Sequence, residues 1–354
     1  MDPTSNALLI ASSPIADLKM WKIGDLKIPG PVVLGPMSGY TFRSYREFMQ
    51  PFGASVVMSE MTSDSAVLNN PSCRSEYLEF DRLPVTGLQL FGSDPERMAS
   101  AASAALKFNP NIDLFDINMS CPVEKVIRSG SGSALMSDPK MCGEMVRRVK
   151  KAVGIPVTAK IRLGQNLEAL NFEEVISELE SADVDAVSLH ARTVKDRYAG
   201  YPRYELVEGL GKRMSVPLII SGNIYSADDA KKAMELTRSE GVMVARGGIG
   251  NPYLLKQIDS LLRESTVLPN PTISQQIDWC IELAEMVFEE KGEDVAVRKM
   301  RSIAPRFIIG CKRCREYRLK LATCIDDWDS MISILEEIRD RKGGMRITTV
   351  SQNT

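Results

Sequence analysis

Eight short apolar runs alternate with amphipathic segments between about residue 32 and residue 262. The runs are rich in β-branched residues and are bounded by Gly, Pro or Asp, as strands buried on both faces are. They cover Val32–Met37, Ala54–Met58, Val85–Phe91, Leu114–Asn118, Val157–Ile161, Ala186–His190, Pro217–Ser221 and Gly241–Ala245. Helices are predicted to start at Asp94-Pro95, at Asp138-Pro139 and at Ser226. The pattern predicts an α/β fold, a closed (β/α)₈ TIM barrel; a doubly wound sheet is disfavoured because no GxGxxG turn follows the first strand.

A purely helical region follows the predicted barrel. Residues 267–273 place two prolines in a polar setting, which is typical of a linker. Residues 274–341 carry apolar residues at helical spacing and no strand pattern. The sequence therefore predicts two domains, a catalytic barrel over residues 1–265 and an all-helical domain over residues 272–354.

Composition narrows the possible chemistry and location. The chain of 354 residues has a single histidine, which excludes a zinc site with two histidine ligands from one chain. Its net charge of −2 gives no global attraction to nucleic acid, and we expect no DNA partner. We see no secretory signal and no apolar run near the roughly 18 residues of a membrane-spanning helix. With an odd cysteine count, these features predict a cytoplasmic protein with reduced thiols and no membrane partner. We also expect a monomer.

Polar and glycine residues gather where the predicted strands end, which is where barrels of this kind place their active sites. The residues named at these strand ends are Pro36, Met37, Ser38, Gly39, Gln89, Asn118, Cys121, Pro122, Lys160, Arg162, His190, Arg192, Ser221, Gly222, Asn223, Arg246, Gly247 and Gly248. The glycines after the last two strands, with a helix start near Asn251-Pro252, predict a phosphate held by backbone N–H groups. The Arg246 guanidinium would donate further hydrogen bonds to that phosphate and add a positive charge. A plain tight turn is the alternative for these glycines, and Ser221-Gly-Asn at the preceding strand favours phosphate.

Cys121 lies past a strand end, where a buried structural role is less expected than for Cys73 or Cys142. A thiol with an ordinary pKa of about 8.5 is mostly neutral at pH 7 and is able to donate a proton. Cys121 is equally suited to be a nucleophile activated by His190. The spacing of the residues leaves both roles open.

His190 and Lys160 are the other titratable candidates at this rim. His190 ends a strand, close in sequence to Arg192, which favours a role in the site over that of a core histidine. Lys160 belongs to an otherwise apolar strand, and its burial would be costly without a negative partner. A bound anion is the expected partner.

Taken together, these motifs resemble the tRNA-dihydrouridine synthase family, flavoenzymes that reduce uridine in tRNA. The resemblance spans nearly all of the predicted barrel, in the order expected for the family. It rests on residues 35–43 (GPMSGYTFR), 89–95 (QLFGSDP), 116–126 (DINMSCPVEKV), 132–136, 160–162, 190–193, 198–200, 221–224 and 245–252. The helical segment is also similar to the tRNA-binding domain of that family.

The resemblance implies FMN as the cofactor and NAD(P)H as the reductant. Residues that would line the flavin ring are Pro36, Met37, Ser38, Gln89 and Lys160. Residues that would hold its phosphate are Ser221, Gly222, Asn223, Ala245, Arg246 and Gly247, with His190 near flavin and substrate. Asn118 and Arg192 would contact the substrate. By analogy, Cys121 would donate a proton to C5 of uracil while reduced flavin delivers hydride to C6.

Two positions depart from the family pattern, and one other family shares part of it. Ser120 and Ala191 stand where the family usually has glycine, which affects packing more than chemistry. The Asn-x-Ser-Cys-Pro motif also resembles dihydroorotate dehydrogenases, which are FMN barrels that use Cys or Ser as a base. A non-catalytic RNA-binding barrel is the third alternative.

The charge distribution favours tRNA as the partner. Residues 298–320 hold nine Lys and Arg residues against one Glu, a charge of +8 in a chain of net charge −2. Such a concentrated basic segment is the footprint of binding to a nucleic-acid backbone. We expect Arg313, Arg315 and Arg318 to contact tRNA. An enzyme for a free pyrimidine would not need this segment.

Four of the seven cysteines, Cys280, Cys311, Cys314 and Cys324, lie in the helical part. Cys311-x-x-Cys314 has the spacing of metal ligands, and four thiolates are able to hold zinc or an iron–sulfur cluster. Because no second CxxC is present, we interpret them as packing thiols and predict no metal site.

Overall fold

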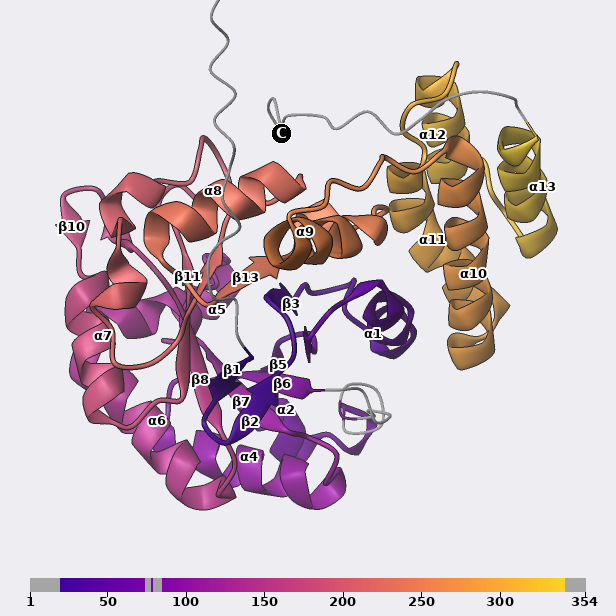
Figure 1. Cartoon of the computed structure of the whole chain (residues 1–354). Helices are drawn as coiled ribbons and strands as arrows, with labels where there is room; N and C mark the ends of the chain where they lie inside the picture. Colours follow the sequence, from indigo (N-terminus) through magenta and orange to yellow (C-terminus); the bar gives the residue numbers. More distant parts are fainter. Residues whose placement is uncertain (1–19, 74–77, 79–84, 341–354) are drawn as a thin grey trace, which may run out of the picture.

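The structure is a computed structural model that describes residues 20–73, 78 and 85–340. Eight parallel strands form a closed barrel (Figure 1). They are β3 (Val32–Leu34), β4 (Val56–Met58), β6 (Thr86–Phe91), β7 (Leu114–Asn118), β8 (Val157–Arg162), β11 (Ala186–His190), β12 (Leu218–Ser221) and β13 (Gly241–Val244). Each pairs with the next along the chain, and β13 pairs with β3 to close the ring. The predicted TIM-barrel fold is confirmed, with strand ends that differ by up to three residues.

The barrel interior changes character along its axis. At one end it is apolar, where Val33, Met58, Leu114 and Ile219 pack with Trp21. The short antiparallel hairpin of β1 (Trp21–Ile23) and β2 (Leu26–Ile28), which the sequence pattern did not predict, contributes to this cluster. Side chains two residues further along each strand point the same way, so the polar residues near the strand ends share the other end of the interior.

Helices surround most of the strands (Figure 1). They are α1 (Arg43–Met49), α2 (Asp64–Asn69), α4 (Pro95–Phe108), α5 (Glu124–Arg128), α6 (Pro139–Val153), α7 (Phe172–Ser181), α8 (Ala227–Thr237) and α9 (Tyr253–Glu264). The three predicted helix starts are confirmed, because Asp94, Asp138 and Ser226 each accept a hydrogen bond from a backbone N–H of the first turn.

The connection between β11 and β12 departs from the regular pattern. Its described residues form only two 3₁₀ helices, Tyr204–Val207 and Leu210–Lys212, after the loop of residues 191–203. A long loop at the carboxyl end of a barrel strand is where such folds carry function. Two shorter pieces, β5 (Thr62–Ser63) beside β6 and the hairpin of β9 (Gly164–Asn166) and β10 (Ala169–Leu170), complete the strands.

Up to residue 340, where the described residues end, four helices follow the linker: α10 (Ile273–Lys291), α11 (Glu293–Phe307), α12 (Cys314–Thr323) and α13 (Trp328–Arg339). A capping box of Thr272 and Gln275 starts α10. The group packs beside the barrel, with α10 next to α1 (Figure 1). Ser44 of α1 donates from its backbone N–H to Glu290 of α10 at 2.8 Å. The predicted all-helical segment is confirmed within the described residues; residues 1–19 and 341–354 of the two predicted domains lie outside them.

Within residues 20–340, leaving aside the short gaps at 74–77 and 79–84, no helix is long and apolar enough to span a membrane.

Candidate active site

A cavity of about 360 Å³ opens at the carboxyl ends of the barrel strands. All twelve residues predicted to hold the cofactor line it: Pro36, Met37, Ser38, Gln89, Lys160, His190, Ser221, Gly222, Asn223, Ala245, Arg246 and Gly247. Asn118 and Cys121 line it as well. Among the described residues, its wall holds Lys160, Arg162 and Arg246 but no Asp or Glu. The cavity is therefore positively charged and suited to an anionic ligand.

A chain of hydrogen bonds connects the barrel interior to Cys121. Asp116 is fully buried on β7 and accepts hydrogen bonds from Gln89 Nε2 and from Thr158 Oγ1, each at 2.6 Å. Burial raises the pKa of Asp116, while the hydrogen bonds from Thr158 and Gln89 oppose the rise. Because Asp116 Oδ2 accepts the amide nitrogen of Gln89, Gln89 Oε1 faces Asn118 and accepts from its Nδ2 at 2.8 Å. Asn118 Oδ1 then accepts the backbone N–H of Cys121 at 2.9 Å. Asp116 thus orients two amides and, through them, the cysteine loop.

Cys121 sits on the cavity wall with 9% of its surface exposed. The loop is anchored further by Ser133, whose hydroxyl donates to the Cys121 carbonyl at 2.9 Å. Burial raises the pKa of the Cys121 thiol, although the backbone of Val123 and the charges of Arg162 and Lys160 oppose this. The thiol therefore holds its proton at neutral pH, as a proton donor must.

Lys160 and His190 stand among several positive charges. Burial and the neighbouring Arg162 lower the pKa of Lys160 to about 8, against the opposing effect of Asp116. Burial, Arg162 and Lys160 lower the pKa of His190 well below its usual range. Arg192 Nη1 lies 3.2 Å from His190 Nε2, and because a guanidinium only donates, this nitrogen is the acceptor. His190 is thus neutral with its proton on Nδ1.

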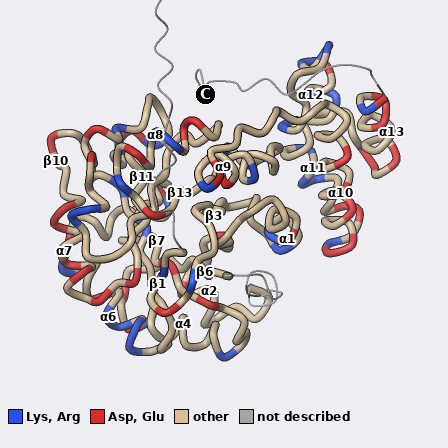
Figure 2. Tube along the Cα trace, in the orientation of Figure 1, with Lys and Arg blue, Asp and Glu red and all other residues tan. Residues whose placement is uncertain are grey.

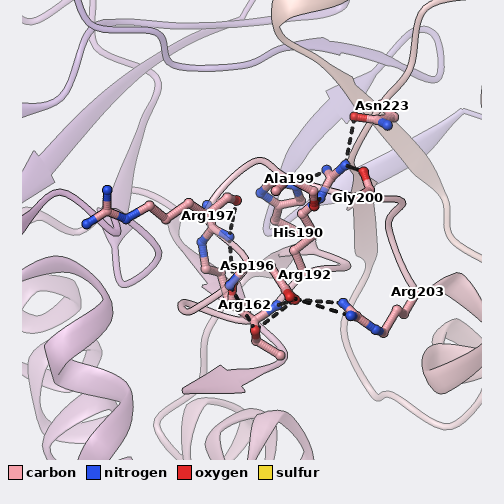
Figure 3. A network of polar contacts seen from close by, with 10 residues as sticks. Arg162, His190, Arg192, Asp196, Arg197, Ala199, Gly200, Arg203 and Asn223 are labelled. Carbon is pink, nitrogen blue, oxygen red and sulfur yellow. Dashed lines mark hydrogen bonds and ion pairs between the residues drawn. The ribbon is translucent and has the colours of Figure 1, made fainter. Parts of the chain in front are cut away.

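Two buried arginines tie the loop after β11 to the site (Figure 3). Arg162 donates to the carbonyls of Ser120 at 2.7 Å, Thr193 at 2.9 Å and Arg197 at 2.8 Å, so it joins the Cys121 loop to the β11 loop. Arg192 donates to the carbonyls of Ala199 and Gly200. These bonds hold a loop that lacks regular structure.

The predicted role of Arg192 is affected by this placement. Its side chain is fully buried and is not among the described residues that line the cavity. Its guanidinium donates hydrogen bonds to His190 Nε2, to two carbonyls of the loop after β11 and to Asn223 Oδ1, the last at 3.0 Å (Figure 3). This arrangement fits a positioning role better than the predicted contact with substrate.

In the predicted phosphate-binding region, two backbone segments approach each other closely. A Cβ added at Gly247 would lie 1.9 Å from the carbonyl oxygen of Ile224, so glycine is required where these two loops meet. Gly222 has φ +132°, which favours glycine for conformational reasons. The Arg246 guanidinium lies over the ring of Tyr198, 4.9 Å from its centroid, and borders the cavity. Backbone cradle and charge together fit a bound phosphate.

Other residues that line the cavity were not among those predicted at the strand ends: Tyr40, Met61, Val123, Tyr198, Ile224, Tyr225, Met243 and Ile249. Tyr40, Val123, Tyr198, Ile224 and Ile249 lie within stretches that resemble the family, which is the signal that was available. Met61, Tyr225 and Met243 lie outside those stretches and have no distinctive spacing, so nothing in one sequence separates them from core residues.

The basic segment of residues 298–320 runs along α11 and α12 (Figure 2), and none of its residues is among the described residues that line the cavity. Arg313, Arg315 and Arg318 are exposed at the start of α12, and Arg313 pairs with Glu316. None of the three is among the described residues that line the cavity. Two other cations of the segment lie nearer the barrel: Arg306 lies over the ring of Tyr40, which lines the cavity, at 5.8 Å, and Lys299 lies over the ring of Phe42 at 4.1 Å.

The four cysteines of the helical part are spread out. Cys280 is fully buried in α10, and Cys324 is exposed at the end of α12. Cys311 and Cys314 lie together, with their sulfur atoms 2.8 Å apart. Within the described part of the chain, no group of three or more His, Cys, Asp or Glu side chains is arranged to hold a metal ion.

The sequence is similar to a family of known proteins. Residues 33–341 match the family model described as dihydrouridine synthase. A protein of Rickettsia bellii named probable tRNA-dihydrouridine synthase is 32% identical over 84% of this chain and 92% of its own length. The protein of Pseudomonas aeruginosa named tRNA-dihydrouridine synthase B is 30% identical over 91% of this chain and 96% of its own length.

Solved structures support the fold alone. Histamine dehydrogenase from Rhizobium aligns with a TM-score of 0.52 at 16% identity, over 74% of this chain and 50% of that one. A 2-naphthoyl-CoA reductase aligns with a TM-score of 0.51 at 13% identity, over 67% of this chain and 51% of that one. This chain thus spans about half the length of those proteins. The match of the family model over residues 33–341 and the 32% identity to the Rickettsia protein show that the chain belongs to the dihydrouridine synthase family.

Proposed function

We propose that this protein reduces the C5–C6 bond of specific uridines in tRNA to 5,6-dihydrouridine, with FMN as cofactor and NAD(P)H as reductant. The observation that carries the proposal is a cationic cavity at the barrel mouth, free of carboxylates among its described lining, in which a protonated thiol faces the same space as Lys160 and His190. The names of the relatives support the substrate, and the family supports a flavin.

The residues of the cavity fit an anionic flavin nucleotide. The cradle of Gly247, Gly222 and Asn223 offers backbone N–H groups and little side-chain bulk, and Arg246 offers charge for a phosphate. Pro36, Met37, Gln89 and Lys160 would line the ring. When bound, FMN supplies the hydride that uracil C6 receives, and NAD(P)H restores the reduced cofactor.

Cys121 donates the proton that completes the reduction at C5. Its raised pKa keeps the thiol protonated until the carbon becomes basic. Asn118 and Ser133 hold the loop backbone, which limits the positions of Sγ. Neutral His190, with Nε2 accepting from Arg192, keeps the N–H on Nδ1 as a donor for a substrate carbonyl.

A uridine must leave its stack to reach the mouth of a barrel. The basic segment of residues 298–320 would hold the tRNA backbone, and its members Arg306 and Lys299 lie against the rings of Tyr40 and Phe42. Tyr40 also lines the cavity, so its ring joins the basic segment to the site of chemistry. We propose that a flipped uridine enters past this edge.

The test is to incubate the purified protein with FMN, NADPH or NADH and unmodified tRNA, and to measure dihydrouridine by mass spectrometry of nucleosides. Wild-type protein should be yellow and active. Cys121→Ala should keep the flavin and lose at least about a hundredfold in rate. Cys142→Ala, which removes a buried thiol of α6, serves as the matched control and should stay active.

Two outcomes contradict the proposal in different ways. Oxidation of dihydroorotate without reduction of tRNA would assign the protein to the chemistry of dihydroorotate dehydrogenases. A colourless protein that binds tRNA and takes up no FMN would make it a non-catalytic RNA-binding barrel. Mapping dihydrouridine in tRNA from cells that lack the protein identifies the modified position.

A further inference from the structure

Two thiols meet at the turn between α11 and α12. The sulfur atoms of Cys311 and Cys314 lie 2.8 Å apart. The Cys314 thiol donates to the Cys311 carbonyl at 2.7 Å, and the Cys311 backbone N–H donates to Cys314 Sγ at 3.0 Å. A disulfide bond requires sulfur atoms about 2.05 Å apart, so a shift of less than about 1 Å would be enough to form one.

The pair is reachable and chemically distinct from the other cysteines. Cys311 and Cys314 are half-buried, whereas Cys280 and Cys142 are fully buried. Burial and the neighbouring Cys314 raise the pKa of the Cys311 thiol, so Cys311 keeps its proton at neutral pH. Cys314 is the first residue of α12, and its sulfur accepts the backbone N–H of Cys311. The first attack on an oxidant therefore falls to Cys314.

We propose that Cys311 and Cys314 are a modification site that forms a reversible intramolecular disulfide with a low-molecular-weight disulfide such as oxidised glutathione. Cys314 Sγ, having lost its proton, attacks one sulfur of the oxidant; the S–S bond of the oxidant breaks and one thiol leaves. Cys311 Sγ then attacks Cys314 Sγ, releases the second thiol and forms the protein disulfide. Two electrons pass from the protein to the oxidant, and the two thiol protons end on the two released thiols.

The position of the pair connects it to the basic segment. Lys312 and Arg313 lie between the two cysteines, and Arg315 follows, all of them exposed. An anionic oxidant is attracted to these charges. On the proposed function, tRNA bound to the same charges covers the turn, so tRNA and oxidant compete for it.

The experiment uses the full chain with its flavin, in buffers of reduced and oxidised glutathione, trapped with N-ethylmaleimide and digested with trypsin. Trypsin cleaves after Lys312 and Arg313, so the disulfide joins two peptides, residues 307–312 and 314–315, that otherwise separate. We expect this linked species to exceed the glutathione adduct of exposed Cys324 by at least about tenfold, since the second thiol is already in contact. Dithiothreitol should reverse it.

Matched variants identify each step. Cys311→Ser should leave a stable glutathione adduct on Cys314, because the resolving thiol is gone. Cys324→Ser should leave the linked species unchanged. Stable adducts on Cys311 or Cys314 of the wild-type protein without a cross-link, or no reaction at either while Cys324 reacts, would overturn the proposal.

A second measurement separates this proposal from the proposed function. Saturating tRNA should slow formation of the cross-link by about threefold or more, and high salt should remove the protection. If tRNA binds and the cross-link forms at an unchanged rate, the disulfide stands and its link to the tRNA surface is overturned. If tRNA does not bind at all, the proposed function fails while the cross-link still reports on the thiol pair.

Discussion

Asn118 fixes the backbone of Cys121: its Oδ1 accepts the Cys121 N–H at 2.9 Å, while its Nδ2 donates to Gln89. Asn118→Ala removes both bonds, and we expect uridine reduction to slow by roughly ten- to a hundredfold because the thiol is misplaced. Asn118→Asp keeps the acceptor for Cys121 and loses the donor to Gln89, so its effect should be smaller. Single-turnover formation of dihydrouridine measures both.

A measurement without tRNA distinguishes the positioning of Cys121 by Asn118 from a direct contact of Asn118 with the substrate. The rate of alkylation of Cys121 by iodoacetamide, followed by peptide mass spectrometry, should rise several-fold in Asn118→Ala and stay near wild type in Asn118→Asp. Equal alkylation rates in all three proteins would mean that Asn118 does not position the cysteine.

The lowered pKa of Lys160 predicts how the affinity for FMN depends on pH. Its pKa is lowered to about 8, so the side chain is charged below pH 8 and loses its proton as the pH rises through that value. If the charged form binds anionic FMN, affinity of the apoprotein should fall about tenfold between pH 7 and pH 9, as the protonated fraction does. Quenching of FMN fluorescence measures this.

Two variants of Lys160 serve as controls for that titration. Lys160→Arg keeps its charge and should bind FMN with little change over this range. Lys160→Met should bind weakly at every pH. A wild-type affinity that stays constant up to pH 9 contradicts the role of Lys160.

The exposed arginines of α12 are expected to act through charge. Replacing Arg313, Arg315 and Arg318 together by Gln should weaken tRNA binding and reduce the slope of log K against log salt by about two to three, since each phosphate contact contributes roughly 0.7–0.9. The matched control replaces two exposed lysines of the barrel, Lys212 and Lys232, by Gln and should leave the slope unchanged. Filter binding between about 50 and 300 mM salt measures both. A slope identical to wild type in the triple variant would place the tRNA surface elsewhere.

Arg306 tests whether the rim matters separately from the helical surface. Its guanidinium lies over Tyr40, which lines the cavity. We expect Arg306→Ala to lower the rate of uridine reduction at saturating tRNA by about tenfold with a modest change in tRNA affinity, because the flipped uridine loses its rim contact. A change in affinity alone, measured by filter binding beside single-turnover assays, would make Arg306 an ordinary phosphate contact.

Gly250 holds the barrel against the helical region. It has φ +69°, and an added Cβ would lie 2.3 Å from the backbone carbon of Arg306. Gly250→Ala should therefore lower the free energy of unfolding in two ways. A residue with a Cβ in the left-handed backbone conformation costs about 1–2 kcal/mol. The clash with Arg306 costs about 1–3 kcal/mol more. Gly154→Ala, at φ +66° with no atom within 4 Å of the added Cβ, should show only the first effect. Thermal denaturation compares them, and equal losses would contradict the close contact.

Much of the fold could be predicted because the same unit, a strand followed by a helix, repeats along the chain. Each strand run carries its own pattern of β-branched residues, and Asp94, Asp138 and Ser226 cap their helices through local bonds. The hairpin at Trp21–Ile28 was missed because its strands are three residues each, too short for a period to appear. The loop after β11 has no period at all, since buried arginines hold it by its carbonyls.

The candidate site, like the fold, could be predicted from the sequence only in part. The sequence alone places Cys121, Lys160 and His190 at strand ends, because a parallel barrel brings all its carboxyl ends to one rim. Only the tertiary structure joins Asp116 to Cys121 through two amides, removes Arg192 from the cavity wall and brings Arg306 to Tyr40. Periodicity reports which face of an element is buried, whereas hydrogen-bond partners and cavity walls depend on side chains that are far apart in the chain and meet only when the barrel closes.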